Sequence, residues 1–91
     1  MWQEQLILRE LELYLKSGDR LNLFREPDNP YDEFAILIKT MDGVKIGYIP
    51  QKDNIIFARL MDAGKLFWGK ITEKEKKGNW LRIKIQVFMH E

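Results

Sequence analysis

Two prolines enclose an Asp-Asn pair at residues 27 to 30, and a short apolar run at residues 35 to 38 follows shortly afterwards. Proline fixes φ and the Asp-Asn pair favours a tight turn, so this stretch predicts a stiff loop that presents polar side chains. The apolar run is bounded by turn signals and is typical of a buried strand rather than of a helix. A stiff polar loop that leads into a core strand is a common place for a binding site.

Alternating apolar residues predict most of the remaining chain to be strands. A first strand is expected at residues 21 to 24. Residues 35 to 49 form a predicted hairpin that turns at Gly43, and residues 66 to 89 form a second hairpin that turns at Gly78. Side chains expected in the core are Phe24, Phe34, Ile36, Ile38, Ile46, Phe57, Leu60 and Phe88.

One helix is predicted between Asp53, which suits an N-cap, and Gly64, which suits the position after a helix. Its apolar residues lie at helical spacing and are Ile56, Phe57, Leu60 and Met61. Several short strands around one helix indicate a mostly β fold. We expect a small barrel of the OB or SH3 type with five or six strands and one or two short helices.

Residues 2 to 15 allow two interpretations. Leu11, Leu13 and Leu15 alternate as in a strand, whereas residues 3 to 13 consist largely of good helix formers. If a first strand forms here and is not held by the rest of the chain, it can pair with a second copy. A homo-oligomer through this segment is therefore one expectation.

Charge is unevenly distributed although the net charge is only +1. The cations of residues 65 to 84 outnumber the two acidic residues there, and they are Lys65, Lys70, Lys74, Lys76, Lys77, Arg82 and Lys84. Together with Trp68 and Trp80, they indicate a weak electrostatic footprint for nucleic acid. The alternative is that residues 73 to 79 are a solvated hairpin.

Several functional classes are excluded by composition. The chain has no cysteine, its only histidine is His90, its only serine is Ser17, and its six glycines are scattered, so no zinc site, catalytic Ser-His pair or phosphate loop is expected. Asp28, Asp32 and Glu33 belong to a turn, where acidic side chains usually bond their own backbone rather than a metal. We expect neither enzyme activity nor a cofactor. No long apolar run or basic leader appears, so a cytoplasmic protein without a membrane partner is expected.

The order of several motifs resembles the HIRAN domain, a small module of Swi/Snf-class DNA translocases and of free-standing bacterial proteins. The matching stretches are Gly18-Asp19, Arg25-Glu26-Pro27, the loop at residues 28 to 34, residues 46 to 50 and residues 58 to 64. The resemblance is strongest over residues 15 to 88, and residues 1 to 14 diverge. We therefore expect residues 1 to 91 to form a single HIRAN-like domain.

The resemblance implies a pocket that captures the free 3′ end of single-stranded DNA. Asn29, Tyr31 and Asp32 lie in the matching loop, and Tyr48 follows the matching Gly47. A carboxylate at Asp32 can accept a hydrogen bond from a 3′-hydroxyl, and the tyrosine rings can stack on bases. Arg25 and Lys52 can reach adjacent phosphates, although Arg25 can equally pair with Glu26 or Asp32 to hold the loop.

The chain departs from the family at the first strand, which usually ends in an aromatic pair. Counting back from Gly18 places Gln5 and Leu6 at these positions, so the aromatic clamp is absent or is replaced by Trp2 or Tyr14.

Two functional hypotheses follow from these patterns. The first is a non-catalytic module that recognises the 3′-hydroxyl end of single-stranded DNA at damaged sites or stalled forks, with a translocase or nuclease as its enzymatic partner. The second is a protein-interaction or dimerisation module without DNA binding. Salt-dependent binding to single-stranded DNA separates the two hypotheses, because phosphate contacts release counterions.

Overall fold

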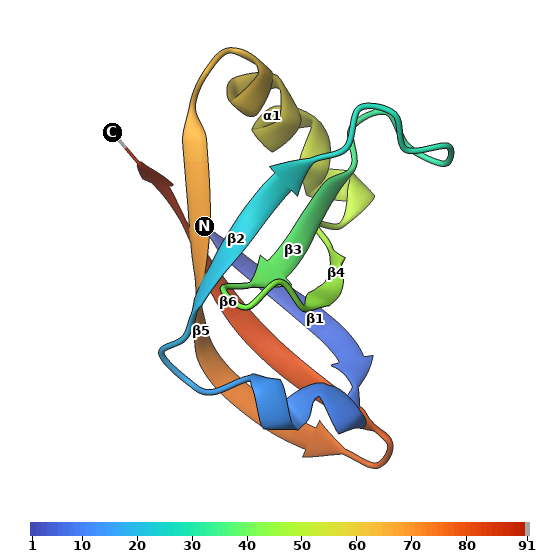
Figure 1. Ribbon diagram of the computed structural model, residues 1–91, viewed down its shortest axis with the longest axis vertical. Helices are drawn as coiled ribbons and strands as arrows, with labels where there is room; N and C mark the ends of the chain where they lie inside the picture. Colours follow the sequence, from blue (N-terminus) through green and yellow to red (C-terminus); the bar gives the residue numbers. More distant parts are fainter. Residues whose placement is uncertain (91) are drawn as a thin grey trace.

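The computed structural model describes residues 1–90, which form a six-stranded antiparallel sheet that curls into a nearly closed barrel (Figure 1). The strand order is β1-β6-β5-β2-β3-β4. The strands are β1 (Trp2–Leu8), β2 (Arg20–Arg25), β3 (Ile36–Thr40), β4 (Lys45–Tyr48), β5 (Leu66–Lys77) and β6 (Trp80–His90), and the helices are the short 3-10 helix η1 (Arg9–Tyr14) and α1 (Gln51–Asp62). The predicted mostly β barrel with one or two short helices is therefore confirmed.

The core lies inside the barrel and is built from alternating strand residues. Most of these side chains are almost fully buried, and they include Leu21, Ile36, Ile38, Ile71, Leu81, Ile83 and Ile85, which are joined by Leu15 from the end of η1. Ile46 and Phe57 also belong to the core, and Phe34 packs against it, as predicted. The prediction was wrong for three other residues. Phe24 and Leu60 are exposed, and Phe88 lies on the outer face of β6, where it stacks on Trp68.

Helix α1 begins earlier than predicted and buries a different face. Its N-cap is Pro50, so Asp53 lies in the first turn and the predicted Asp53 cap is wrong. The buried positions are Asn54, Phe57 and Ala58, whereas Ile56 is exposed. The end of the helix is as predicted, because Gly64 adopts a φ of +98°, a conformation that glycine tolerates best.

The N-terminal segment contains a strand and a 3-10 helix, but not where the two interpretations had them: residues 2 to 8 are the strand, and Leu11 and Leu13 lie in the helix. The alternation in β1 departs from that of an ordinary barrel strand, although Ile7 points into the core as usual. Gln3 and Gln5 point inward and are nearly buried, while Leu6 and Leu8 point outward. Residues 2 to 8 all pair with β6 of the same chain, so the first strand is held without a second copy.

Gln5 also bridges the two edges of the sheet. No backbone ladder joins β1 to β4. Instead, the Gln5 amide Nε2 donates a hydrogen bond of 2.8 Å to the carbonyl oxygen of Tyr48 at the end of β4. The inward glutamine is therefore explained by its role in closing the barrel.

Four of the seven cations in the basic C-terminal third form ion pairs, with acidic residues of the same hairpin or of the N-terminal segment. Arg82 lies between Glu75 and Glu4, at 2.6 Å and 3.4 Å. The other ion pairs of this region are Lys76 with Glu12, Lys77 with Glu75 and Lys84 with Glu73. These contacts favour the solvated-hairpin interpretation of residues 73 to 79.

Within residues 1–90, no helix has the length and apolar character that a membrane span requires.

Candidate functional site

The loop between β2 and β3 is closed at its base by backbone hydrogen bonds. The amide of Glu26 donates to the carbonyl oxygen of Ala35 at 3.0 Å. Inside the loop, the Asn29 amide donates to Glu26 O and the Ala35 amide donates to Asp32 O, each at 3.1 Å. Two consecutive turns therefore form the loop, in agreement with its proline and Asx content.

Arg25 fastens this loop to the rest of the barrel. Its guanidinium donates to the carbonyl oxygens of Ala35 and Glu33 at 2.8 and 3.0 Å, and to both carboxylate oxygens of Asp62 at the end of α1. The Arg25 side chain is only 14% exposed. The acidic partner of Arg25 is thus Asp62, rather than Glu26 or Asp32. The hydrogen bonds from Arg25 lower the pKa of the Asp62 carboxyl.

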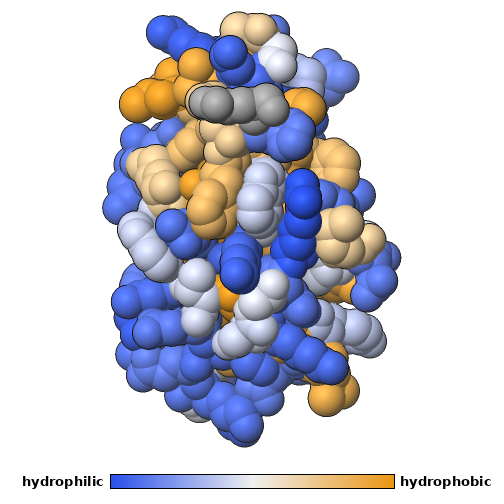
Figure 2. Space-filling view, turned by 90° about the vertical axis from the view of Figure 1, so that its left-hand side faces the viewer, coloured by the Kyte–Doolittle hydropathy of each residue, from blue (hydrophilic) through white to orange (hydrophobic). Residues whose placement is uncertain are grey.

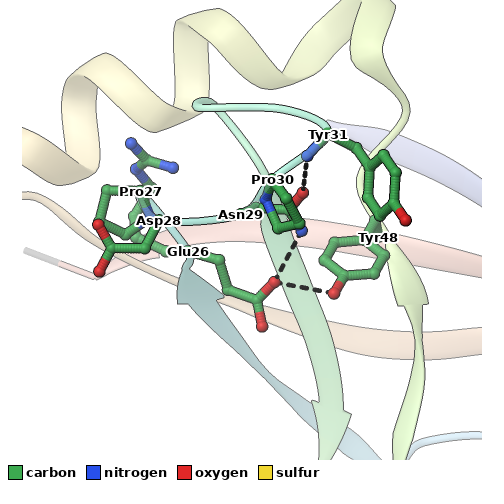
Figure 3. A pocket seen from close by; sticks show the side chains of 8 residues that line it. Glu26, Pro27, Asp28, Asn29, Pro30, Tyr31 and Tyr48 are labelled. Atoms are coloured by element: carbon green, nitrogen blue, oxygen red, sulfur yellow. Dashed lines mark hydrogen bonds between the residues drawn. The ribbon is translucent and has the colours of Figure 1, made fainter.

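An open groove of about 670 Å³ lies between the loop and the end of β4 (Figure 3). Its lining residues are Arg25, Glu26, Pro27, Asp28, Asn29, Pro30, Tyr31 and Tyr48. A smaller hollow of about 240 Å³ adjoins it and is lined by Asn29, Tyr31, Asp32, Ala35, Tyr48, Ile49 and Gln51. Three residues line both hollows, so the two form one continuous site, which we call the loop pocket.

Glu26 is the centre of a hydrogen-bonded cluster in the loop pocket. Its Oε1 accepts a hydrogen bond of 2.8 Å from the Tyr48 hydroxyl and one of 3.1 Å from the Asn29 amide (Figure 3). These two bonds lower the pKa of Glu26, and the positive charges of Lys45 and Lys39 act in the same direction. The same bond to Glu26 raises the pKa of Tyr48. The pocket therefore holds an ionised carboxylate at neutral pH.

Asn29 organises the loop through both ends of its amide. Its Oδ1 accepts hydrogen bonds from the backbone amides of Tyr31 and Asp32, and its Nδ2 donates to Glu26. This is ordinary Asx-turn geometry. It also places the amide of Asn29 at the wall of the pocket.

Asp32 is held by two hydrogen bonds, one to each carboxylate oxygen. Oδ1 accepts from the backbone amide of Phe34 at 2.9 Å, and Oδ2 accepts from Nδ2 of Asn54 at 2.6 Å. Asn54 is a helix residue that is only 2% exposed. Because a carboxylate offers about four acceptor sites, Asp32 retains acceptor capacity toward the smaller hollow.

The two tyrosines present their rings to the pocket. Tyr31 is 92% exposed and Tyr48 is 43% exposed, and Figure 3 shows both rings on the same side of the pocket. The structure thus brings together Asn29, Tyr31, Asp32 and Tyr48. Lys52 is exposed on the first turn of α1 and lines neither hollow, whereas its neighbour Gln51 lines the smaller one.

Sequence reasoning missed Glu26 as a pocket residue. The first and fourth residues of a β-turn lie close together, so the turn that begins at Glu26 brings its side chain beside Asn29. The order Glu-Pro-Asp-Asn at residues 26 to 29 therefore already indicated in the sequence that Glu26 lies beside Asn29.

The proposed replacements for the aromatic clamp lie outside the loop pocket. Trp2 lines a different hollow with Thr72, Glu73 and Lys84, and Tyr14 lies in η1. Gln5 reaches the backbone of Tyr48 instead of the pocket surface. The rings that line the loop pocket in residues 1–90 are those of Tyr31 and Tyr48.

Acidic side chains are present at the pocket, but they do not form a metal centre in the described part of the chain. Among residues 1–90, no group of three or more His, Asp or Glu side chains is arranged to hold a metal ion.

Comparison with known proteins identifies the family of the chain. The model of the HIRAN domain family matches residues 8–91. The chain belongs to the HIRAN domain family. This HIRAN family is known for DNA binding. No curated protein matches the chain.

Two solved structures share the HIRAN fold of this chain. A protein from Lactobacillus plantarum is 24% identical, with a TM-score of 0.73 and full coverage of both chains. The HIRAN domain of human HLTF is 20% identical, with a TM-score of 0.70, and the match covers 97% of this chain and 74% of that one. At these levels of identity the similarity establishes the fold, and the site must be argued from the residues of this chain.

Proposed function

We propose that this protein is a non-catalytic module that binds single-stranded DNA by capturing its 3′-hydroxyl end in the loop pocket. The observation that carries the proposal is the combination, in one pocket, of two accessible tyrosine rings with the carboxylates of Asp32 and Glu26. Rings offer stacking faces to bases, and carboxylates accept hydrogen bonds from hydroxyls.

Asp32 is the proposed acceptor for the 3′-hydroxyl. It lines the smaller hollow, and its two structural hydrogen bonds leave acceptor sites on both oxygens. A 3′-phosphate would instead bring negative charge toward both Asp32 and Glu26. The pocket should therefore discriminate between the two ends by repulsion as well as by attraction.

Tyr31 and Tyr48 are the proposed base platforms. Tyr48 is fixed by its hydroxyl bond to Glu26 and by the Gln5 bond to its carbonyl oxygen. Tyr31 protrudes from a loop whose backbone is held by hydrogen bonds from Arg25. Replacing either tyrosine by alanine should weaken binding by about 1 to 3 kcal/mol if the ring stacks on a base.

Fluorescence anisotropy with one oligonucleotide in two forms tests the proposal. The strand with a 3′-hydroxyl should bind more tightly than the strand with a 3′-phosphate, and Asp32→Ala should abolish this preference. Equal affinity for both ends in the wild type, or no binding at low salt, would refute end capture. That result would favour the protein-interaction module instead.

A module of this kind needs a partner for any enzymatic step. We place its action at exposed 3′ ends, such as those at damaged sites or stalled forks, beside a translocase or nuclease that carries out the reaction. Co-purification with such an enzyme in a DNA-dependent manner is the corresponding measurement.

A further inference from the structure

The outer face of β2, β3, β4 and the first half of β5 carries cations and aromatic rings, and none of the outward strand residues there is acidic. Leu21, Leu23, Ile36 and Ile38 point into the core, so their neighbours along the strands point outward. The outward cations are Arg20, Lys39, Lys45 and Lys70, and the outward aromatic residues are Phe24, Tyr48 and Trp68. We call this surface the basic-aromatic face.

The strand register joins most of these residues into two neighbouring rows, and Arg20 pairs with Lys70 in a third. Phe24 pairs with Leu37, which pairs with Tyr48. In the next row, Lys45 pairs with Lys39, Lys39 with Asn22, and Asn22 with Trp68. Figure 2 views the molecule from the β5 side, where apolar residues gather in the upper half and hydrophilic residues cover the lower half.

The cations of this face have no acidic partner within residues 1–90. None of the four takes part in an ion pair there, in contrast to the neutralised cations of the β5-β6 hairpin. Two of them lie over rings instead. Arg20 is 4.4 Å from the centre of the Trp68 ring, and Lys39 Nζ is 5.2 Å from that of Phe24.

The basic-aromatic face is continuous with the loop pocket through Tyr48. The Tyr48 hydroxyl donates its hydrogen bond to Glu26 inside the loop pocket. On the outer face, Tyr48 pairs with Leu37, and Leu37 pairs with Phe24. Lys39 and Lys45 are close enough to Glu26 for their charges to contribute to its lowered pKa. Positive charge therefore begins at the pocket and extends away from it across the sheet.

We propose that the basic-aromatic face is a second contact surface for the single strand, along which the nucleotides that precede the captured 3′ end leave the loop pocket. Lys39 and Lys45 contact phosphates, and Phe24 offers a stacking face to a base. This inference rests on the proposed end capture. Across β4, β3, β2 and β5 the path measures about 14 Å, which suits about four stacked nucleotides.

Charge complementarity selects a polyanion as the occupant. A second copy of the chain would have to place carboxylates opposite four unpaired cations, whereas a nucleic acid strand supplies one phosphate per nucleotide. Proteins that bind single-stranded nucleic acids combine cations that contact phosphates with accessible aromatic rings that stack on bases.

The test compares a deoxythymidine dinucleotide with an octanucleotide, each in the 3′-hydroxyl and 3′-phosphate forms. Wild-type protein should bind the octanucleotide more tightly than the dinucleotide. The double substitution Lys39→Gln with Lys45→Gln should remove most of this gain and reduce the slope of log affinity against log salt by about 1.4. It should leave the preference for the 3′-hydroxyl unchanged. Phe24→Ala should weaken octanucleotide binding about fivefold or more.

Lys76→Gln with Lys77→Gln is the matched control, because it removes the same charge from cations that are already paired with Glu12 and Glu75. Equal losses in both double variants would overturn the proposed path. So would a wild-type protein that prefers the 3′-hydroxyl but gains nothing from length, and in that case end capture would stand. A length gain without end preference would support the path and refute end capture. A Lys39 and Lys45 variant that changed the molar mass in solution rather than DNA affinity would assign the face to a second copy.

Discussion

Gln5 occupies the space in which a side chain on residue 47 would begin. A Cβ atom added to Gly47 would lie 2.6 Å from Gln5 Oε1, while Gln5 Nε2 donates its hydrogen bond of 2.8 Å to the carbonyl oxygen of Tyr48. The absent side chain of Gly47 and the amide of Gln5 thus fit together at the seam between β1 and β4. This seam positions Tyr48, whose ring lines the loop pocket.

Gly47→Ala should lower the free energy of unfolding by about 1 kcal/mol, because the Gln5 amide must leave its acceptor. The backbone itself tolerates alanine, since Gly47 does not have a positive φ. In a Gln5→Ala background the same change should cost much less. Urea unfolding of the four proteins of this double-mutant cycle measures the coupling. Strictly additive losses would show that the two residues do not interact.

Tyr48→Phe should raise the pKa of Glu26 toward the ordinary glutamate value, because the Tyr48 hydroxyl is the largest cause of the lowered pKa. NMR titration of the Glu26 carboxyl carbon measures this shift. Tyr31→Phe is the control, since the Tyr31 hydroxyl makes no hydrogen bond within residues 1–90. An unchanged Glu26 titration in Tyr48→Phe would contradict the hydrogen bond.

The same bond predicts how the stability difference between wild type and Tyr48→Phe depends on pH. The folded-state pKa of Glu26 is lowered, so its contribution is present above the unfolded-state pKa and is lost as pH falls through the folded-state pKa. The pKa of Tyr48 is raised, so its contribution is present at neutral pH and is lost as pH rises beyond about 10. The difference should therefore be largest near neutral pH and shrink at both extremes.

The strands and turns were predictable because they depend on local patterns. Alternation identified β2 and both hairpins, and Gly78 allows the turn of the second one with its positive φ of 61°. The inward face of β1 was not predictable in this way. Two of its three inward positions are occupied by Gln3 and Gln5, whose partners Asp53 and Tyr48 are more than forty residues away in the chain. Hydrophobic periodicity contains no information about such distant polar partners.

The buried face of α1 was mispredicted for the same reason. Asn54 takes an inward position because its amide holds Asp32, and this rotates Ile56 and Leu60 toward solvent. The loop pocket was predictable in outline, since the prolines and Asx residues define it locally. The acidic partner of Arg25 was not, because Asp62 lies at the far end of the helix.

Arg25→Lys should destabilise the protein by about 1 to 2 kcal/mol, because lysine cannot reproduce the planar fork that bonds two carbonyl oxygens and Asp62. Arg25→Gln, which removes the charge, should leave the salt dependence of DNA binding unchanged, since the guanidinium is already engaged. Urea unfolding and anisotropy at several salt concentrations measure the two effects. Lys52→Gln is the comparison. Because Lys52 is exposed, the free energy of unfolding of this variant should lie within about 0.5 kcal/mol of the wild-type value. Wild-type stability in Arg25→Lys together with a flatter salt slope in Arg25→Gln would identify Arg25 as a phosphate contact instead.

Asp32→Ala should have two separable effects. It leaves the buried Asn54 amide without an acceptor, which should lower the free energy of unfolding by about 1 to 3 kcal/mol. It should also abolish the preference for a 3′-hydroxyl over a 3′-phosphate. Thermal unfolding measures the first effect, and anisotropy at a temperature where all variants are folded measures the second.

Asn54→Ala separates structure from recognition at this position. It removes the same hydrogen bond of 2.6 Å but keeps the Asp32 carboxylate, so it should be destabilised and still prefer the 3′-hydroxyl. If Asn54→Ala loses the preference as completely as Asp32→Ala does, Asp32 acts only by shaping the loop. If Asp32→Ala retains the preference, the acceptor is Glu26, the other carboxylate of the loop pocket, and Glu26→Gln should then abolish the discrimination between the two ends.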